Sequence, residues 1–232
     1  MKYLTRSKVY EKVEPKKDAK KIYIFCEGEE TEIRYFKYFQ GFSSNIDIIP
    51  IPNINGQSDP IKLKENAEFL FFGNNLTLAK FKLSSEYKDE VWFAIDTDRW
   101  NEGNKILELR EYCASKNTNL NPWTVVQSNP CFELWFYYHV YDIKPNANEV
   151  ANSKGFKNFV NTKIKGGFDS RKMPIELETA IQNSIKNFEV EQNQPKLYST
   201  EAHLLGTKIL PFVKTQLDKL KKMMLKQNIS KK

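Results

Sequence analysis

The chain has 232 residues, of which 40% are hydrophobic and 13% aromatic, so it can hold one large domain, or a medium domain with appendages, around a substantial core. No stretch approaches the ~20 apolar residues of a membrane span, and the polar first residues do not form a secretory signal, so we expect a cytoplasmic protein without membrane contact. Only two histidines and three scattered cysteines argue against a zinc site and a disulfide framework; we expect Cys26, Cys113 and Cys131 to be buried free thiols in a reducing compartment.

The formal net charge of +7 is concentrated at the two ends of the chain. Residues 1–21 carry eight basic and three acidic side chains, and residues 214–232 carry seven basic and one acidic, which leaves a net charge of −4 between them. Basic ends around an acidic middle suit a polyanionic partner held near a metal-binding centre. Lysine-rich ends are equally a feature of solvated termini.

The first half of the chain alternates between strand and helix patterns. Residues 1–20 lack a long apolar face, and we expect them to form a basic N-terminal arm. After this arm the sequence predicts strands over 22–26, 46–51, 91–95 and 123–126, and helices over 30–41, 61–72 and around 106–113. This order predicts an α/β fold with a central, mainly parallel sheet flanked by helices.

The pattern changes after residue 130. The sequence predicts an almost wholly apolar helix over 131–141, a polar stretch over 142–170, and helices over 174–190 and 200–225, the last kinked or broken near Pro211. We therefore divide the chain into four parts: a basic arm (1–20), an α/β core (21–141), a helical C-terminal part packed on the core (142–226) and a basic tail (227–232).

Acidic residues follow two of the predicted strands. Glu27 comes directly after the first, and Asp96 and Asp98 follow the third at alternate positions, which share one side of an extended segment. If these strands are neighbours, their ends lie ~5 Å apart and bring the three carboxylates together. Such a cluster favours a divalent cation, and hard oxygen ligands suit Mg²⁺ or Mn²⁺. Taken singly, the same residues have plainer interpretations, as a solvated turn, a helix cap or the first-turn acids of a helix, the last applying to Glu29, Glu30 and Glu32.

A third polar segment, residues 128–136 (SNPCFELWF), follows the fourth predicted strand. Pro130 suits the first turn of a helix, so Glu133 lies in that turn, either as a ligand of a second metal or as an acid that complements the helix dipole. We expect His139 to be a hydrogen-bonded core histidine, and Cys131 has no local histidine to activate it as a nucleophile. Basic groups that could stabilise charge on a phosphate come later, but their spacing singles out none of them: Arg171, Lys196 and His203.

Taken together, three segments resemble the RloB-like family. They are residues 26–32 (CEGEETE), 95–98 (IDTD) and 128–136, followed by His139, in the same order and at similar spacing. The resemblance covers about residues 20–205 and implies that the core (21–141) is a variant topoisomerase–primase (Toprim) domain. It aligns Glu27 with the Toprim glutamate, Asp96 and Asp98 with its acidic pair, and Glu133 with the second-metal glutamate of related nucleases.

The resemblance also implies a function. It indicates a metal-dependent nuclease that cleaves DNA or RNA, tRNA included, as the effector of an abortive-infection defence against phage, with a separate ABC- or AAA-type ATPase (RloA-like) as partner. Glu27, Asp96, Asp98 and Glu133 would be both the catalytic residues and the ligands of Mg²⁺ or Mn²⁺. There is no P-loop motif, so the chain is not itself a P-loop NTPase.

Two further hypotheses remain open at this point. The protein could be a non-catalytic nucleic-acid-binding or adaptor subunit, whose carboxylates hold a structural Mg²⁺ and whose basic ends bind the polyanion. It could also be a Mn²⁺-dependent nucleotide-sugar transferase, which would explain the Asp96 and Asp98 pair but not Glu27. The oligomeric state cannot be read from the sequence.

Overall fold

The computed structural model describes residues 12–53, 56, 58–97 and 103–229. The strands are β1 (Lys20–Cys26), β2 (Ile46–Ile51), β3 (Glu90–Asp96), β4 (Trp123–Asn129), β5 (Val190–Glu191), β6 (Gln194–Pro195) and β7 (Ser199–Thr200). The helices are α1 (Thr31–Lys37), α2 (Pro60–Phe72), α3 (Lys105–Lys116), α4 (Glu133–Tyr138), α5 (Ala147–Ala151), α6 (Phe156–Lys163), α7 (Leu177–Asn187) and α8 (Ala202–Ile229), with a 3-10 turn, η2 (Met173–Glu176), before α7.

A five-stranded sheet, in the order β2-β1-β3-β4-β7, forms the centre of the fold. The first four strands are parallel, and the two-residue β7 pairs antiparallel with the end of β4. β1 and β3 are neighbours, with Cys26 opposite Ala94. The carboxyl ends of the four parallel strands therefore meet at one edge of the sheet. The predicted α/β class with a mainly parallel sheet is confirmed.

Side chains of the strands alternate between two buried faces. In β1, Ile22, Ile24 and Cys26 belong to one apolar cluster, and Tyr23 and Phe25 belong to a second cluster on the opposite face. This follows from the two-residue period of a strand, and it explains why β1 and β3 are apolar at nearly every position. Each face of such a sheet must be covered by helices.

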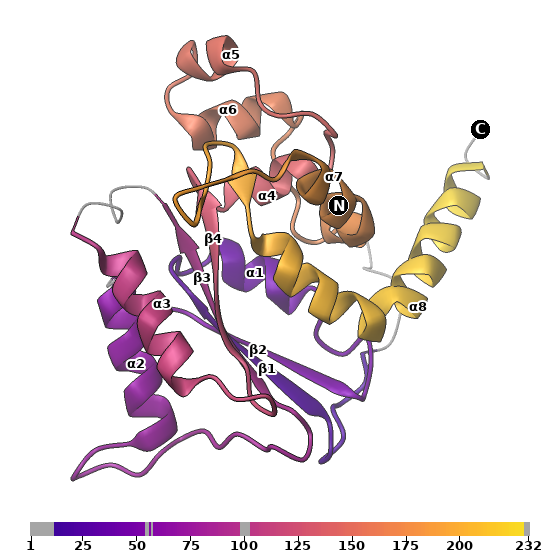
Figure 1. The fold of residues 1–232 in the computed structure, drawn as a ribbon. Coiled ribbons are helices and arrows are strands. Elements are labelled where there is room, and N and C mark those ends of the chain that lie inside the picture. Colours follow the sequence, from indigo (N-terminus) through magenta and orange to yellow (C-terminus); the bar gives the residue numbers. More distant parts are fainter. Residues whose placement is uncertain (1–11, 54–55, 57, 98–102, 230–232) are drawn as a thin grey trace, which may run out of the picture.

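Different helices cover the two faces. α2 and α3 lie over one face, and their buried residues include Leu63, Ala67, Ile106 and Leu109. The other face is covered by α1 and the helices of the C-terminal half, with α4 buried along most of its length. Figure 1 shows α2 and α3 on one side of the sheet and α1 and α8 on the other.

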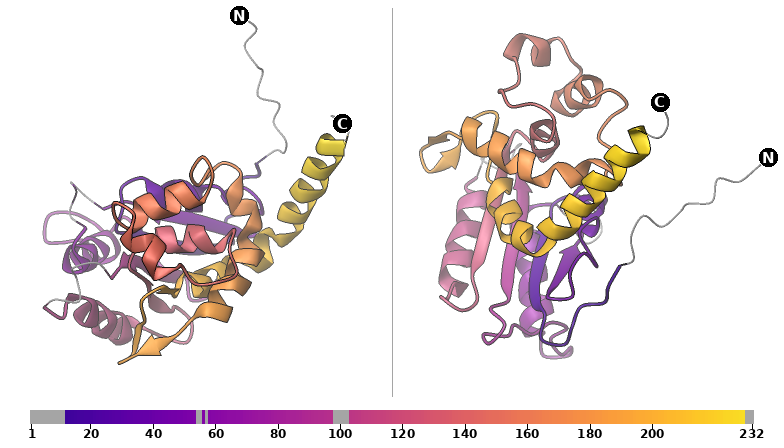
Figure 2. Two further views of the ribbon diagram at one scale, coloured as in Figure 1. Left: turned by 90° about the horizontal axis from the view of Figure 1, so that it is seen from above. Right: turned by 90° about the vertical axis from the view of Figure 1, so that its right-hand side faces the viewer.

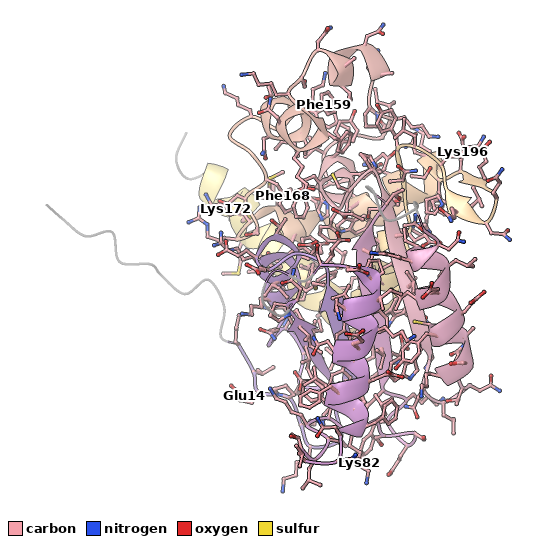
Figure 3. All side chains as sticks on the ribbon, turned by 90° about the vertical axis from the view of Figure 1, so that its left-hand side faces the viewer. Glu14, Lys82, Phe159, Phe168, Lys172 and Lys196 are labelled. Atoms are coloured by element: carbon pink, nitrogen blue, oxygen red, sulfur yellow. The ribbon has the colours of Figure 1, made fainter. Side chains whose placement is uncertain are left out.

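The helical C-terminal part sits beyond the carboxyl ends of the strands. α4 follows β4 directly, and α5 and α6 lie further from the sheet (Figure 1). Figure 3 shows Phe159 of this part near the end of the molecule opposite Lys82, which precedes β3. The edge of the sheet where the acidic residues gather is therefore overlaid by the C-terminal half.

Some elements differ from those predicted. The polar stretch 142–170 contains α5 and α6, whose apolar signal is small because only Phe159 and Val160 are buried in them. The strand β7 is two residues long and was not predicted. Of the two alternatives predicted for Pro211, a kink or a break, the break is wrong: α8 continues past Pro211 to Ile229, and its ribbon changes direction along its length (Figures 1 and 2).

The described part of the basic arm runs beside the core. The backbone N–H of Val13 donates to the carbonyl of Gly41, and that of Lys16 donates to the carbonyl of Ser44, each at 2.9 Å. β1 begins at Lys20, one residue before the predicted core. Among the helices of the described residues, none has both the length and the apolar composition needed to cross a membrane.

Candidate metal centre

Asp96 ends β3 at the edge of the sheet. The strand is buried along its whole length, and the side chain of Asp96 is only 10% exposed. The backbone N–H of Phe132, in the turn that follows β4, donates a 2.7 Å hydrogen bond to Asp96 Oδ1. The turn after the neighbouring strand therefore holds one carboxylate oxygen of Asp96 and leaves Oδ2 for other partners.

Glu27, immediately after β1, lies next to Asp96. Its backbone N–H donates to the carbonyl of Ala94 at 3.1 Å, which extends the pairing of β1 with β3 by one residue. Its Oε2 accepts a 2.7 Å hydrogen bond from the backbone N–H of Asp96, and the side-chain amide of Asn53 donates to its carbonyl. The two residues, 69 positions apart in the chain, are thus brought together.

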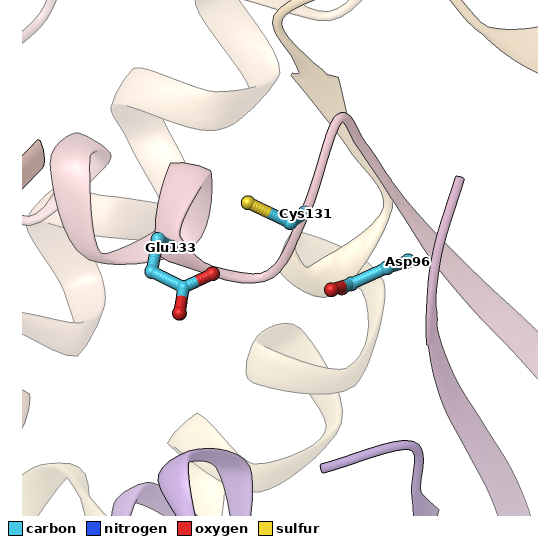
Figure 4. Close-up of side chains that lie close together, drawn as sticks. All are labelled: Asp96, Cys131 and Glu133. Atoms are coloured by element: carbon cyan, nitrogen blue, oxygen red, sulfur yellow. The ribbon is translucent and has the colours of Figure 1, made fainter. Parts of the chain in front are cut away.

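Cys131 and Glu133 reach the same point from the other side. Pro130, Cys131 and Phe132 form the turn between β4 and α4, and Glu133 is the first residue of α4. Potential ligand atoms of Asp96, Cys131 and Glu133 all lie within 4.8 Å of one another (Figure 4). Glu133 Oε2 is buried and has no hydrogen-bond partner in the described part of the chain.

A further carboxylate, that of Glu32, comes from the first turn of α1. Glu32 is 5% exposed, and its Oε1 accepts a 3.2 Å hydrogen bond from the backbone N–H of Gly28. A Cβ atom at position 28 would collide with the Glu32 carboxylate. Glycine after Glu27 therefore lets the chain turn closely over a buried acid, which any larger residue would displace.

Lys157 of α6 faces these acids from the helical part. Its Nζ lies 3.6 Å from Glu133 Oε1 and 4.0 Å from Asp96 Oδ2. Within the described residues it is the only cation that lies within 4.0 Å of either carboxylate. Partial burial lowers the pKa of Lys157, but the Glu133 and Asp96 carboxylates outweigh this effect, so the pKa lies above its ordinary value.

Burial and repulsion from neighbouring carboxylates disfavour the ionised forms of Asp96 and Glu32. Burial raises the pKa of Asp96 well above its ordinary value, and the carboxylates of Glu27, Glu32 and Glu133 raise it further, while Lys157 opposes them. Burial is also the main cause of the raised pKa of Glu32. The free energy of the folded protein would therefore fall if a cation of higher charge joined the cluster.

The donor atoms fit a divalent cation. The unpartnered Glu133 Oε2 and the Asp96 carboxylate supply oxygen, and the Cys131 thiol supplies sulfur. Oxygen donors alone suit Mg²⁺ and Mn²⁺, whereas a set that includes a thiolate favours softer ions over Mg²⁺. Burial, reinforced by Glu133 and Asp96, raises the pKa of Cys131, so without a metal its thiol is protonated.

The structure describes three of the four acids predicted for the site. Ligand atoms of Asp96 and Glu133 converge, Glu27 lies beside Asp96 through the bond to its backbone N–H, and Asp98 lies outside the described residues. His139 is a core residue: its Nδ1 lies 2.9 Å from the carbonyl of Trp135 and its Nε2 lies 3.2 Å from the hydroxyl of Tyr35. The later basic candidates have other partners, namely Asp169 for Arg171, Glu189 for Lys196, and Thr200 and Ser184 for His203.

Three residues of the cluster, Glu32, Lys157 and Cys131, were not predicted as site residues. Glu32 carried a signal, its place in the acidic run after β1, but that run is also typical of an ordinary helix start. Lys157 carried none, because it lies in a lysine-containing polar stretch and reaches the acids only through the packing of α6. Cys131 was expected to be a buried free thiol, as it is, and was considered as a nucleophile but not as a metal ligand.

The fold and the site define an α/β protein with a carboxylate-rich candidate metal centre at the carboxyl ends of a parallel sheet. The model of the family described as RloB-like protein matches residues 22–214, so the chain belongs to the RloB-like family. The matched region contains all of the central sheet except the first two residues of β1, and it includes Glu27, Glu32, Asp96, Glu133 and Lys157. Neither the curated proteins nor the solved structures contain a match to this chain.

Proposed function

We propose that this RloB-like protein is a Mg²⁺- or Mn²⁺-dependent nuclease that hydrolyses phosphodiester bonds in DNA or RNA. Glu27, Asp96, Asp98 and Glu133 are the proposed metal ligands and catalytic residues. The observation that carries the proposal is the convergence of Asp96 and Glu133, from different strands and turns, beside Glu27 at one buried edge of the sheet. Lys157 is the only cation of the described residues within 4.0 Å of Asp96 or Glu133, so acids gathered in this way are costly unless they also bind an ion or a substrate.

The residues of the chain divide the work between positioning and binding. Besides its proposed role as a ligand, Glu27 fixes the backbone at Asp96. The N–H of Phe132 fixes the Asp96 carboxylate, which leaves Asp96 Oδ2 and Glu133 Oε2 to accept a cation. A bound divalent ion would supply Lewis-acid stabilisation of the negative charge on a phosphate and would lower the pKa of water. Glu32, which is buried beside the proposed ligands and has a raised pKa, is in its ionised form a stronger base toward water than an ordinary carboxylate.

The substrate class and the setting rest on charge and on the family. The basic ends, with net charges of +5 and +6, suit a polyanion, and a nucleic acid is the polyanion that a phosphodiesterase cleaves. The resemblance to Toprim nucleases and to abortive-infection effectors supports a role in defence against phage, with an ABC- or AAA-type ATPase as partner and tRNA among the candidate substrates.

Cleavage assays with conservative variants test the proposal. The purified chain is incubated with Mn²⁺ and either plasmid DNA or total tRNA, and compared with Asp96→Asn, Glu27→Gln and Glu133→Gln. We expect cleavage by the parent chain and a loss of at least about 10²-fold in each variant, since a metal ligand or its support is removed. Glu86→Gln, an exposed acid before the start of β3, is the matched control and should cleave normally.

Other outcomes would favour other functions. Cleavage that survives Asp96→Asn and Glu133→Gln unchanged would remove these residues from the active site. Metal-dependent binding of nucleic acid without cleavage, in the presence and absence of ATPase partner candidates, would favour the non-catalytic subunit. Circular dichroism of each variant separates loss of function from loss of fold.

A further inference from the structure

Lys157 places its ammonium group beside the carboxylates of Glu133 and Asp96, but at distances longer than those of a hydrogen-bonded ion pair. Its Nζ stands 3.6 Å from Glu133 Oε1 and 4.0 Å from Asp96 Oδ2, both longer than a hydrogen bond, and its side chain is 65% exposed. The two acids that it faces have side chains only 10% and 12% exposed. The ammonium group thus stands at the solvent side of the buried carboxylates.

The attachment of α6 to the core does not depend on this lysine. Phe159 and Val160, on the same helix, are 3% and 0% exposed and belong to the large apolar cluster. Another lysine of the helix, Lys163, forms a 2.6 Å ion pair with Glu149. Lys157 can therefore change position without releasing α6, because apolar burial holds the helix.

A metal ion and the Lys157 ammonium would compete for the same two carboxylates. An ion that binds Asp96 Oδ2 and Glu133 Oε2 neutralises the charge that attracts Lys157, and two cations held this close repel each other. The exposed, four-carbon stem of lysine gives the ammonium a path into solvent. The arrangement is that of a removable, tethered counter-ion.

We propose that Lys157 is a built-in counter-ion of the carboxylate cluster, which balances the cluster in the metal-free protein and lowers its affinity for the divalent cation that displaces it. This inference deepens the proposed function, since it concerns how the same site takes up its metal. It makes Lys157 a residue that sets metal affinity, distinct from the metal ligands themselves.

The test is a Mn²⁺ titration by calorimetry without nucleic acid, so that no catalytic activity is required. Lys157→Gln should bind Mn²⁺ about three- to tenfold more tightly than the parent chain, since a competing charge is removed. Lys157→Arg retains the charge and should bind as the parent does. Lys154→Gln, an exposed lysine just before α6, removes the same charge away from the acids and should change the dissociation constant by less than about twofold.

A second measurement, of thermal stability without metal, should show an effect of Lys157→Gln in the opposite direction. In EDTA, Lys157→Gln should unfold at a lower temperature than the parent chain, because the acids lose their counter-ion. Lower thermal stability together with tighter Mn²⁺ binding is the signature of a counter-ion, and a merely damaged fold would weaken both. Unchanged or weaker Mn²⁺ binding by Lys157→Gln would overturn the inference. Tighter binding without any cleavage activity in the parent chain would uphold it while refuting the nuclease.

Discussion

Asp96 shows how one residue can be placed at a cost to stability. Its carboxylate is almost fully buried, and burial and three neighbouring acids raise its pKa, yet its Oδ1 still accepts the hydrogen bond from the N–H of Phe132. A carboxylate in such a position is stabilised by a bound cation and destabilises the protein without one. Sites of this kind are typical of residues retained for function.

This cost predicts that Asp96→Asn stabilises the metal-free protein. Asparagine keeps an oxygen that can accept the bond from Phe132 but cannot ionise. We expect a gain on the order of 1 kcal/mol at pH 7 in EDTA, or about 2–4 °C in melting temperature. Scanning calorimetry with and without Mn²⁺ measures it: Mn²⁺ should raise the melting temperature of the parent chain and leave that of Asp96→Asn nearly unchanged.

The pH dependence of the same gain has a definite sign. Because the pKa of Asp96 is raised in the folded state, the folded protein binds the proton of the Asp96 carboxyl group more tightly than the unfolded chain does. The contribution of Asp96 therefore lowers the free energy of unfolding of the parent chain as the pH rises from the ordinary aspartate pKa through the raised pKa. Below the ordinary pKa this loss of stability vanishes. A variant that is equally stabilised at pH 3 and pH 7, or is destabilised at pH 7, would contradict this account.

At the scale of single residues, the sequence identified the acids that end strands. Glu27, Asp96 and Glu133 follow apolar runs or a proline-marked helix start, and the parallel sheet brings such positions together. Glu32 and Lys157 join the cluster through the packing of α1 and α6. Packing of this kind has no local signature, so it could not be predicted.

At the scale of elements, the strands with continuous apolar runs were the most predictable. β2 has the predicted bounds, and β1 and β3 extend beyond theirs by one or two residues. β1 and β3 could be recognised because two-sided burial requires apolar residues at nearly every position in their centres. β7 consists of Ser199 and Thr200, and it exists only because the end of β4 offers unpaired backbone groups there. A two-residue strand has no periodicity to detect.

The contact between α7 and α8 depends on a small residue. Gly206 of α8 is buried, and a Cβ atom there would lie 3.1 Å from Ile181 Cγ1 and 3.3 Å from Leu177 Cδ1 of α7. We expect Gly206→Leu to destabilise the protein by about 1–3 kcal/mol through overpacking, although leucine favours a helix over glycine by nearly 1 kcal/mol in isolation. Urea denaturation measures the difference.

Lys208→Leu is the control for this prediction. It places the same side chain two residues further along α8, at an exposed position, and should change the free energy of unfolding by less than about 0.5 kcal/mol. If Gly206→Leu proved as stable as Lys208→Leu, the two helices would not be packed as closely as these distances indicate.

At the scale of the whole molecule, the fold gathers the acidic cluster at one edge of the sheet and packs an aromatic core next to it. His139 belongs to that core: it is buried among Tyr35, Trp135 and Phe168, with both ring nitrogens near hydrogen-bonding partners. The Trp135 carbonyl can only accept, so Nδ1 carries the proton and Nε2 accepts from the Tyr35 hydroxyl. The expectation of a core histidine, drawn from its apolar neighbours in the sequence, agrees with this environment.

His139 therefore makes global stability sensitive to acid. Burial lowers its pKa to about 3, although the bond to Trp135 opposes this, whereas in the unfolded chain the pKa is about 6.5. The unfolded state alone gains the proton between these values, so His139 should remove about 1.4 kcal/mol of stability per pH unit as the pH falls below about 6 toward 3. Above about pH 6.5 neither state takes up this proton, so His139 causes no loss of stability there.

Comparison with His139→Gln isolates this contribution, because the opposing effects of Asp96 and Glu32 and the lowered pKa of His203 are common to both proteins. Urea denaturation at intervals from pH 7.5 to 4.5 should show a free energy of unfolding that falls more steeply for the parent chain than for the variant, whatever their difference at pH 7.5. His203→Gln should retain the steep fall due to His139. Parallel curves for the parent chain and His139→Gln would mean that the histidine takes up its proton in the folded state, through solvent access that its 3% exposure excludes.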